Sequence, residues 1–329
     1  MNRPNPGPVV VIGETLIDLL PGTGGGVREL PGGSPANVAV ALGRLGRTPV
    51  LATTLADDAR GAAAARWLEA SGVRLVAQPP ATGRTSTAAV RFAADGSAAY
   101  DFDLTWDLAA ATAARACGGG PAAVHTGSIA TVLDPGADAV EEAVRAASGR
   151  ALVTFDPNAR PAVTPDLAAV LPRVERLIEA SDVVKVSEED LAWYRPGADP
   201  VAVAREWAAA GPVLVAVTRG AHGSVLVRGR DVIEEPGVRV AVADTIGAGD
   251  TYMGALIDAL LGLGAHGPAA RAALAGLARE RLRLAASWAA HAAAVTVARP
   301  GADPPARAEL GGVPDPGGAR GPVPTADGA

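Results

Sequence analysis

Short apolar runs alternate with helical patterns through most of this chain, and that alternation restricts the fold more than any other feature. The strand-like runs are Val9–Ile12, Val50–Thr54, Ala122–His125, Ala151–Phe155, Val183–Val186 and Val213–Thr218. Several are apolar throughout, which is typical of parallel strands covered by helices on both faces. The expected helices between them are 36–45, 62–70, 138–146 and 167–179. This order predicts an α/β fold built on a parallel sheet.

Two stretches depart from the alternation. Ser86–Phe92 and Ser97–Phe102 flank the turn signal Asp95-Gly96, so we expect an antiparallel hairpin that projects from the main sheet. A small antiparallel meander is expected from three later runs, 224–227, 232–235 and 238–242.

The last part of the chain changes character twice. Residues 249–294 have a helical pattern, and their arginine- and alanine-rich middle, 271–283, is expected to form an exposed helix. After Gly301 the composition shifts to Pro, Gly, Ala and Asp. We therefore predict one domain over residues 8–302 and a disordered tail over 303–329.

Charge and composition exclude several classes of protein. The 329 residues carry 29 basic and 35 acidic side chains, a net charge of −6, which argues against a nucleic-acid partner. No apolar run approaches the roughly 18 residues of a membrane span, and no signal-peptide core follows Met1. A single cysteine, Cys117, excludes an internal disulfide. We expect a cytoplasmic protein without a membrane partner.

Residues 31–46 carry the signals of a well-capped helix. Ser34 suits the N-cap, Pro35 suits the first helical position, and Gly46 suits the C-terminal cap. A helix alone would satisfy this pattern, so it is weak support for a binding site.

Three further residues of this segment point to a ligand. Gly32 and Gly33 would let a ligand approach the backbone closely. Asn37 places an amide in the first turn of an otherwise apolar helix, where it can donate and accept hydrogen bonds with a polyol.

The second segment with functional chemistry is 244–255, where a glycine turn leads into a helix. Free N–H groups at Gly247, Ala248 and Gly249 are expected to form an anion hole for phosphate oxygens. Asp250 follows in the same turn, where an acid would repel a phosphate. Stabilisation of the helix N-terminus is the simpler interpretation, but deprotonation of an attacking hydroxyl explains the position better.

Other nucleotide motifs are missing. The phosphate loop Gly-x-x-x-x-Gly-Lys-Ser/Thr does not occur, and Lys185, the only lysine among the 29 basic residues, follows no glycine loop. The first strand leads into Gly13-Glu14-Thr15 rather than a Gly-x-Gly-x-x-Gly turn, which disfavours a nicotinamide-dependent oxidoreductase.

The two glycine segments together resemble the paired signatures of the ribokinase-like (PfkB) carbohydrate kinases, nearest in pattern to bacterial fructokinases. Their order and their separation of about 210 residues match that family, and the resemblance runs from Val9 to Gly301. It implies a three-layer α/β/α sandwich with a small β lid, formed from about 14–33 and 84–106.

The resemblance also assigns roles to single residues around the sugar. Asp18, Gly32, Gly33 and Asn37 match the family's sugar-binding positions, and Asp250 matches its catalytic base.

A further match involves Arg160. It ends the run Phe155-Asp156-Pro157-Asn158-Ala159-Arg160, which resembles a segment of fructokinases and ketodeoxygluconate kinases. There Arg160 would face the substrate or a phosphate, although an ordinary turn at the end of a strand would look the same.

Nucleotide and metal positions follow in the same way. Lys185 would contact the phosphate chain, although many relatives have Asn there, and Glu188 would organise Mg²⁺ through water. Thr218, Gly220 and Gly223 resemble the nucleotide loop that follows a buried strand.

The family's monovalent-cation loop would lie around four residues of this chain. They are Asp244, Ile246, Thr296 and Gly301. Because most of its ligands are backbone oxygens, the sequence leaves a requirement for K⁺ open.

The resemblance predicts an ATP-dependent kinase that phosphorylates a primary hydroxyl of a small sugar. Fructose is the first choice because of Gly13-Glu14 with Asp18 and because of the 155–160 segment. 2-Keto-3-deoxygluconate and ribose are the alternatives, and a nucleoside is disfavoured. A non-catalytic nucleotide- or sugar-binding protein of the same fold, and a homodimer formed through the lid, are also left open.

Overall fold

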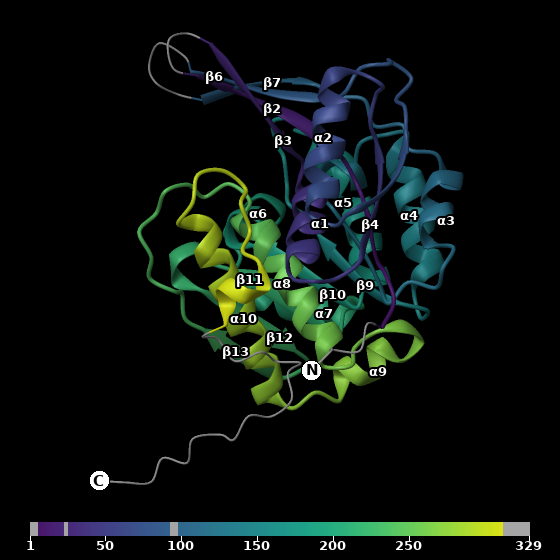
Figure 1. Ribbon diagram of the computed structural model, residues 1–329. Helices are drawn as coiled ribbons and strands as arrows, with labels where there is room; N and C mark the ends of the chain where they lie inside the picture. The colour runs from purple at the N-terminus through teal and green to yellow at the C-terminus, as the bar shows by residue number, and fades with distance from the viewer. Residues whose placement is uncertain (1–5, 23–25, 93–97, 312–329) are drawn as a thin grey trace.

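The computed structural model describes residues 6–22, 26–92 and 98–311, which form a three-layer body and a projecting second sheet (Figure 1). The central sheet has nine strands in the order β13-β12-β11-β10-β9-β8-β1-β4-β5. Neighbours from β5 to β11 run parallel, and β12 and β13 are antiparallel. The strands are β1 Val9–Ile12, β4 Pro49–Thr54, β5 Arg74–Gln78, β8 Ala123–Gly127, β9 Leu152–Asp156, β10 Val183–Ser187, β11 Leu214–Thr218, β12 Ser224–Arg228 and β13 Asp231–Glu235.

Helices cover both faces of this sheet, as expected. Val9 and Val11 of β1 join the cluster on one face, whereas Val10 and Ile12 join the cluster on the other, because successive side chains of a strand point to opposite faces. The first cluster includes α1 (Ser34–Arg44), α8 (Ala248–Gly262), α9 (Ala270–Ala275), α10 (Arg279–Val297) and Leu68 of α2 (Ala59–Ala70). The second includes α3 (Ala110–Cys117), α4 (Gly136–Ala147), α5 (Leu167–Ala180), α6 (Glu188–Tyr194) and α7 (Pro200–Ala210).

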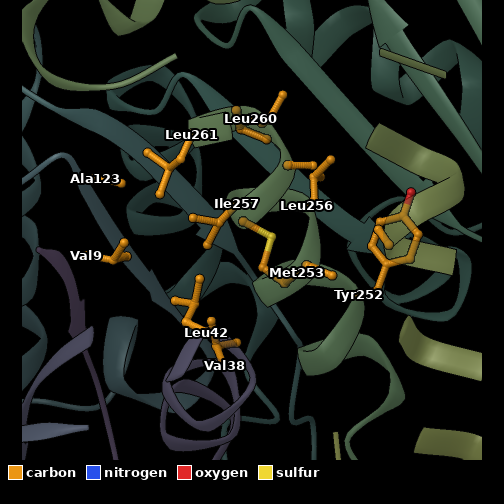
Figure 2. Packing of buried hydrophobic residues seen from close by; sticks show 14 of the residues in the cluster. Val9, Val38, Leu42, Ala123, Tyr252, Met253, Leu256, Ile257, Leu260 and Leu261 are labelled. Atoms are coloured by element: carbon orange, nitrogen blue, oxygen red, sulfur yellow. The ribbon is translucent and has the colours of Figure 1, made fainter. Parts of the chain in front are cut away.

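Helices α1 and α8 pack closely against each other. Val38 and Leu42 of α1 point toward Ile257 of α8 in Figure 2. Gly254 permits this contact, since a Cβ there would lie 2.8 Å from the Cβ of Ala41. The packed pair therefore holds the first turns of both helices in a defined relation.

A second sheet of four strands, in the order β3-β2-β6-β7, projects from the body (Figure 1). Its strands are β2 Leu16–Pro21, β3 Val27–Gly32, β6 Thr87–Phe92 and β7 Ala98–Asp103. The antiparallel pairing of β6 with β7 confirms the predicted hairpin, although its turn at Asp95-Gly96 lies outside the described residues. Strand β2 pairs with β6 in parallel, and this pairing joins the β2–β3 hairpin to the β6–β7 hairpin.

Two sequence-based expectations are wrong. Residues 238–242 form no strand, so the meander ends with β13. Residues 271–283 are not one helix, because α9 ends at Ala275 and α10 begins at Arg279. The guanidinium of Arg228 donates to the carbonyls of Leu274, Ala275 and Leu277, and these bonds satisfy the chain where the helix stops.

The predicted boundary of the tail at residue 303 is also wrong. Asp303 forms an ion pair with Arg44, and Leu310 in the final 3₁₀ turn is 1% exposed. Arg307 donates to the buried Asp258 of α8 at 2.5 Å, and its guanidinium lies 5.3 Å from the ring centre of Trp288. Residues 303–311 therefore belong to the body, and 312–329 lie outside the described residues. No helix within the described ranges is long and apolar enough to span a membrane.

Truncation tests this correction. Ending the chain after Pro304 removes Leu310 and Arg307, and we expect a loss of about 2–4 kcal/mol in the free energy of unfolding, from lost apolar burial and the lost contact with Asp258. Ending it after Gly311 keeps both residues and serves as the matched control. Urea unfolding of the two truncated chains measures the difference, and equal stability would contradict the packing of 303–311.

Candidate active site

The predicted functional residues gather where the carboxyl ends of the central strands meet the start of α8. Asp156 ends β9, Lys185 is the middle residue of β10, and Thr218 ends β11. In open α/β sheets, ligands bind at this edge. Residues that are far apart in the sequence are thereby brought to the same edge of the sheet, where the parallel strands end.

The first turn of α8 has the form of an anion site. Gly247 precedes the helix with a φ of 75°, a conformation that favours glycine. Of the three N–H groups predicted to be free, that of Ala248 is not, because it donates to the Thr245 carbonyl at 3.3 Å. Gly249 and Asp250 follow, and N–H groups in a first turn have no acceptor within the helix. These N–H groups and the helix dipole together favour a bound anion.

Asp250 is buried and hydrogen-bonded to α1. Ser34 Oγ donates to Asp250 Oδ1 at 2.6 Å, and Asn37 Nδ2 donates to Asp250 Oδ2 at 2.7 Å. The three side chains belong to residues that are only 7–8% exposed. Asn37 Oδ1 is buried and has no hydrogen-bond partner within the described part of the chain. The site thus offers a positioned carboxylate beside an unsatisfied acceptor.

The predicted role of Ser34 as an N-cap is wrong. The N-cap is Gly33, which has a φ of 105° and provides no side-chain hydrogen bond. Helix α1 therefore begins one residue earlier than a serine cap would require, and Pro35 is its second residue rather than its first. The C-terminal signal is confirmed, because Gly46 has a φ of 81° directly after the helix.

Asp18 and the two glycines lie on the side of the second sheet. A Cβ at Gly32 would lie 2.3 Å from Asp18 Oδ2, and one at Gly33 would lie 2.6 Å from the Glu14 carbonyl oxygen. Both glycines therefore make room for neighbouring atoms. Burial raises the pKa of Asp18 to about 6, with Arg160 opposing the shift and Asp250 adding to it. Asp18, Arg160 and Asp250 are thus electrostatic neighbours.

Arg160 is exposed, and it has a buried electrostatic neighbour, Glu14, which belongs to the Gly13-Glu14 pattern but was not predicted as a site residue. The Arg160 guanidinium donates to Asn158 Oδ1 at 2.8 Å. Glu14 Oε2 accepts from the Ala130 N–H at 3.2 Å. Burial raises the pKa of Glu14 to about 7, against hydrogen bonds and the charge of Arg160 that lower it.

Lys185 does not reach into solvent as a phosphate-binding lysine would. It is 3% exposed, and its Nζ donates to Asp156 Oδ2 at 2.8 Å. A Cβ at Gly249 would lie 3.0 Å from this Nζ, so the ammonium lies directly beside the anion turn. Burial would lower the pKa of Lys185, but the carboxylates of Asp156, Asp190 and Asp250 outweigh it and raise that pKa. Lys185 therefore provides a fixed positive charge at this turn.

Three acids, Glu188, Glu189 and Asp190, occupy the first turn of α6, and the least exposed of them is not the predicted one. Glu188 is exposed, whereas Asp190 Oδ1 accepts from the Ala159 N–H at 3.0 Å. Asp190 also forms a capping box with Ser187. The Ser-x-x-Asp spacing was the sequence signal for this arrangement. Glu188 as the metal-organising residue remains a prediction.

The predicted nucleotide loop is a tight turn between β11 and β12. Arg219 N–H donates to the Gly223 carbonyl at 2.7 Å, and a Cβ at Gly223 would lie 2.1 Å from the Glu235 carbonyl oxygen. Gly220 is exposed and Thr218 is half-buried at the edge of the sheet. The loop thus leaves exposed backbone at Gly220, next to the end of β11.

The segments expected to hold a monovalent cation lie side by side. Asp244 Oδ2 accepts from the Gly301 N–H at 2.8 Å, and Asp244 Oδ1 accepts from the Ile246 N–H at 3.0 Å. Thr296 Oγ1 lies 2.9 Å from Thr251 Oγ1 of α8. These contacts join the 244–246 loop to the end of α10 behind the anion turn.

Comparison with known proteins agrees with this geometry. Residues 8–309 match the profile of the pfkB family carbohydrate kinases. A fructokinase of Rhizobium leguminosarum bv. trifolii is 35% identical over 260 residues, which cover 77% of this chain and 79% of that protein. A fructokinase of Escherichia coli is 32% identical over 266 residues, covering 78% and 85%.

Among solved structures, a fructokinase of Xylella fastidiosa with bound ATP superposes with a TM-score of 0.78. It is 27% identical, and the match covers 90% of this chain and 93% of that one. Since the family profile spans nearly all of the described residues, this chain belongs to the pfkB family of carbohydrate kinases.

Proposed function

We propose that this kinase transfers the γ-phosphate of ATP to a primary hydroxyl of fructose. The observation that carries the proposal is the buried Asp250 carboxylate, held by Ser34 and Asn37 at the first turn of α8. A base and an anion site in one turn are what phosphoryl transfer to an alcohol requires. Fructose is favoured because the curated relatives are fructokinases, and ATP because the solved fructokinase contains it.

The sugar would occupy the space between the second sheet and α1. Asn37 Oδ1, which is buried and unpaired within the described residues, is a suitable acceptor for one sugar hydroxyl. The carboxyl group of Asp18 lies on the opposite side and can accept from another. In this pose a primary hydroxyl lies beside Asp250, between the sugar site and the anion turn.

The reaction then follows from these positions. The primary hydroxyl gives its proton to Asp250, and its oxygen forms a bond with the γ-phosphorus of ATP. The bond between that phosphorus and the β,γ-bridging oxygen breaks, and ADP leaves with the electron pair. The predicted anion-hole N–H groups of Gly247 and Gly249, with the Lys185 ammonium beside Gly249, stabilise the negative charge on the transferred phosphoryl group.

The acids at the start of α6 suit Mg²⁺, which prefers oxygen ligands and keeps several waters. Glu188 is exposed to solvent, and the charge of Asp190 acts on Lys185 and raises the pKa of Asp156. We propose that these carboxylates hold the water shell of the ion, which when bound offsets phosphate charge. A monovalent cation in the 244–246 loop and a homodimer through the second sheet remain predictions.

The second sheet would act as a lid over the sugar. Asp18 belongs to β2 of that sheet, and its pKa responds to Asp250 of the body. A lid that closes over the reacting groups excludes water and limits ATP hydrolysis.

Gly32→Ala tests the sugar site and the lid together. A Cβ at this position would displace the Asp18 carboxylate, so we expect the KM for fructose to rise about tenfold, the effect of one lost hydrogen bond to a charged group. The KM for ATP should stay within about twofold, because Asp18 is on the sugar side. Gly119→Ala, where a new Cβ would have nothing within 4 Å and the backbone is not left-handed, is the control for a glycine change. An unchanged KM for fructose in Gly32→Ala would contradict the assignment of Asp18.

A steady-state assay of ADP release with a panel of sugars tests the proposed substrate. We expect the highest kcat/KM with fructose, and lower values with 2-keto-3-deoxygluconate and ribose. The exposed guanidinium of Arg160 is the observation that favours 2-keto-3-deoxygluconate as second candidate, because that sugar carries a carboxylate. Phosphorylation of none of them, in protein that binds ATP, would indicate a nucleotide-binding protein without catalysis.

A further inference from the structure

We propose that Ser34 is a positioning residue for the reaction: its hydroxyl fixes the Asp250 carboxylate so that Oδ2 faces the substrate. This inference rests on the proposed role of Asp250 as the base. Its starting point is the 2.6 Å hydrogen bond from Ser34 Oγ to Asp250 Oδ1, which joins residues 216 positions apart. Neither helix propensity nor capping explains it.

The hydroxyl of Ser34 is free for this task because of its place in α1. Gly33 is the N-cap, so Ser34 is the first helical residue and caps nothing. Pro35 follows and has no N–H that could donate to the serine oxygen. The single hydroxyl proton of Ser34 is therefore donated across to α8 instead of being used within α1.

Ser34 and Asn37 form a matched pair. They are three residues apart on α1, so their side chains project from the same face of the helix. One donates to Oδ1 of Asp250 and the other to Oδ2, which sets the plane of the carboxylate. The close packing of α1 on α8 at Gly254 prevents the two helix starts from shifting apart.

The pair also distinguishes the two oxygens of Asp250. Asn37 bonds Oδ2 through its amide nitrogen and leaves its own Oδ1 buried and unpaired within the described residues. A sugar bound at that unpaired oxygen places its next hydroxyl beside Asp250 Oδ2. Ser34 occupies Oδ1, on the other side. The proton of the primary hydroxyl is thus transferred to Oδ2, and Ser34 keeps Oδ1 in place during the transfer.

Ser34→Ala is the direct test. The carboxylate loses one of its two restraints, so we expect kcat to fall about tenfold, since small misplacements of a reacting group have effects of this size or larger. The KM values for fructose and ATP should change by less than about twofold, because Ser34 contacts neither in this arrangement. Ser34→Thr keeps the hydroxyl and should restore most of kcat.

A control variant and a double-mutant comparison with Asp250→Asn distinguish a positioning role of Ser34 from a folding role. Ser224→Ala removes another buried hydrogen bond to α8, from Tyr252 OH at 2.9 Å, without touching Asp250. It should lower the melting temperature about as much as Ser34→Ala and leave kcat unchanged. In an Asp250→Asn background, Ser34→Ala should alter the residual turnover by less than about twofold, because its target is already removed.

The outcomes are distinct. Unchanged kcat in folded Ser34→Ala, or an equal loss of kcat with and without Asp250, would overturn the role of Ser34. If Asp250→Asn itself keeps normal turnover, the proposed base fails first, and the role of Ser34 fails with it. A large loss with Asp250→Asn but none with Ser34→Ala rejects only the positioning role.

Discussion

Asp250→Asn is expected to lower turnover by roughly 10²–10⁴-fold, the range for loss of a general base. Asparagine matches aspartate in shape but cannot accept the proton of the sugar hydroxyl. It also removes a negative charge from the turn that would hold the γ-phosphate, so the affinity for ATP should be unchanged or slightly higher. Steady-state kinetics and calorimetric titration with ATP on one preparation measure both effects.

A second buried acid of α8 is the matched control for this change. Asp258 is fully buried and bound by Arg47 at 2.7 Å, far from the anion turn at the other end of the helix. Asp258→Asn should lower the melting temperature and spare the turnover of the folded fraction. If Asp250→Asn gave that same result, Asp250 would be only a stabiliser of the helix N-terminus, and the proposed mechanism would be wrong.

Lys185→Met is expected to destabilise the protein by about 3–5 kcal/mol, the usual cost of leaving one partner of a buried ion pair without the other. The change strands the Asp156 carboxylate, whose Oδ1 already has no hydrogen-bond partner among the described residues. Burial raises the pKa of Asp156 to about 6, with Lys185 as the main opposing influence. The destabilisation caused by Lys185→Met should therefore be smallest at acidic pH, where the unpaired carboxyl group of Asp156 is protonated and carries no buried charge. Urea unfolding at pH 5 and pH 8 measures this difference.

The double variant Lys185→Met with Asp156→Leu separates stability from electrostatics at the anion turn. Replacing both partners by apolar groups should restore most of the lost stability. The positive charge beside Gly249 is still absent, so we expect the KM for ATP to remain about tenfold above that of the natural protein. Recovery of both stability and KM would show that the lysine serves the fold alone.

Much of the fold follows from local patterns in the sequence. The six predicted strands of the body all exist, with ends shifted by at most two residues, because a strand covered on both faces must be apolar along its whole length. The glycine turn before Asp250 was recognisable for a similar reason. The turn before this helix requires a left-handed backbone at Gly247, with a φ of 75°, and glycine is the residue type that adopts it most readily.

The errors arose where a local signal competed with a distant contact. Serine is a residue type that favours the N-cap position, but the Ser34 hydroxyl donates a hydrogen bond to Asp250, which is more than 200 positions away. Residues 303–311 are poor in apolar side chains, yet the buried Asp258 gives Arg307 a partner that fixes them to the body. The arginine-rich segment 271–283 is interrupted between Ala275 and Arg279, where the distant Arg228 donates to its carbonyls.

The sequence by itself determined the order of the body's strands and helices and the two glycine turns, and it predicted Asp250 as the base, since these depend on neighbouring residues. Only the tertiary structure decided that Ser34 and Asn37 bind the two oxygens of Asp250, and that Lys185 pairs with Asp156 under Gly249. The reason is physical. A buried polar atom must find a partner wherever the packed chain provides one, and that choice is made between elements whose relative position no local pattern specifies.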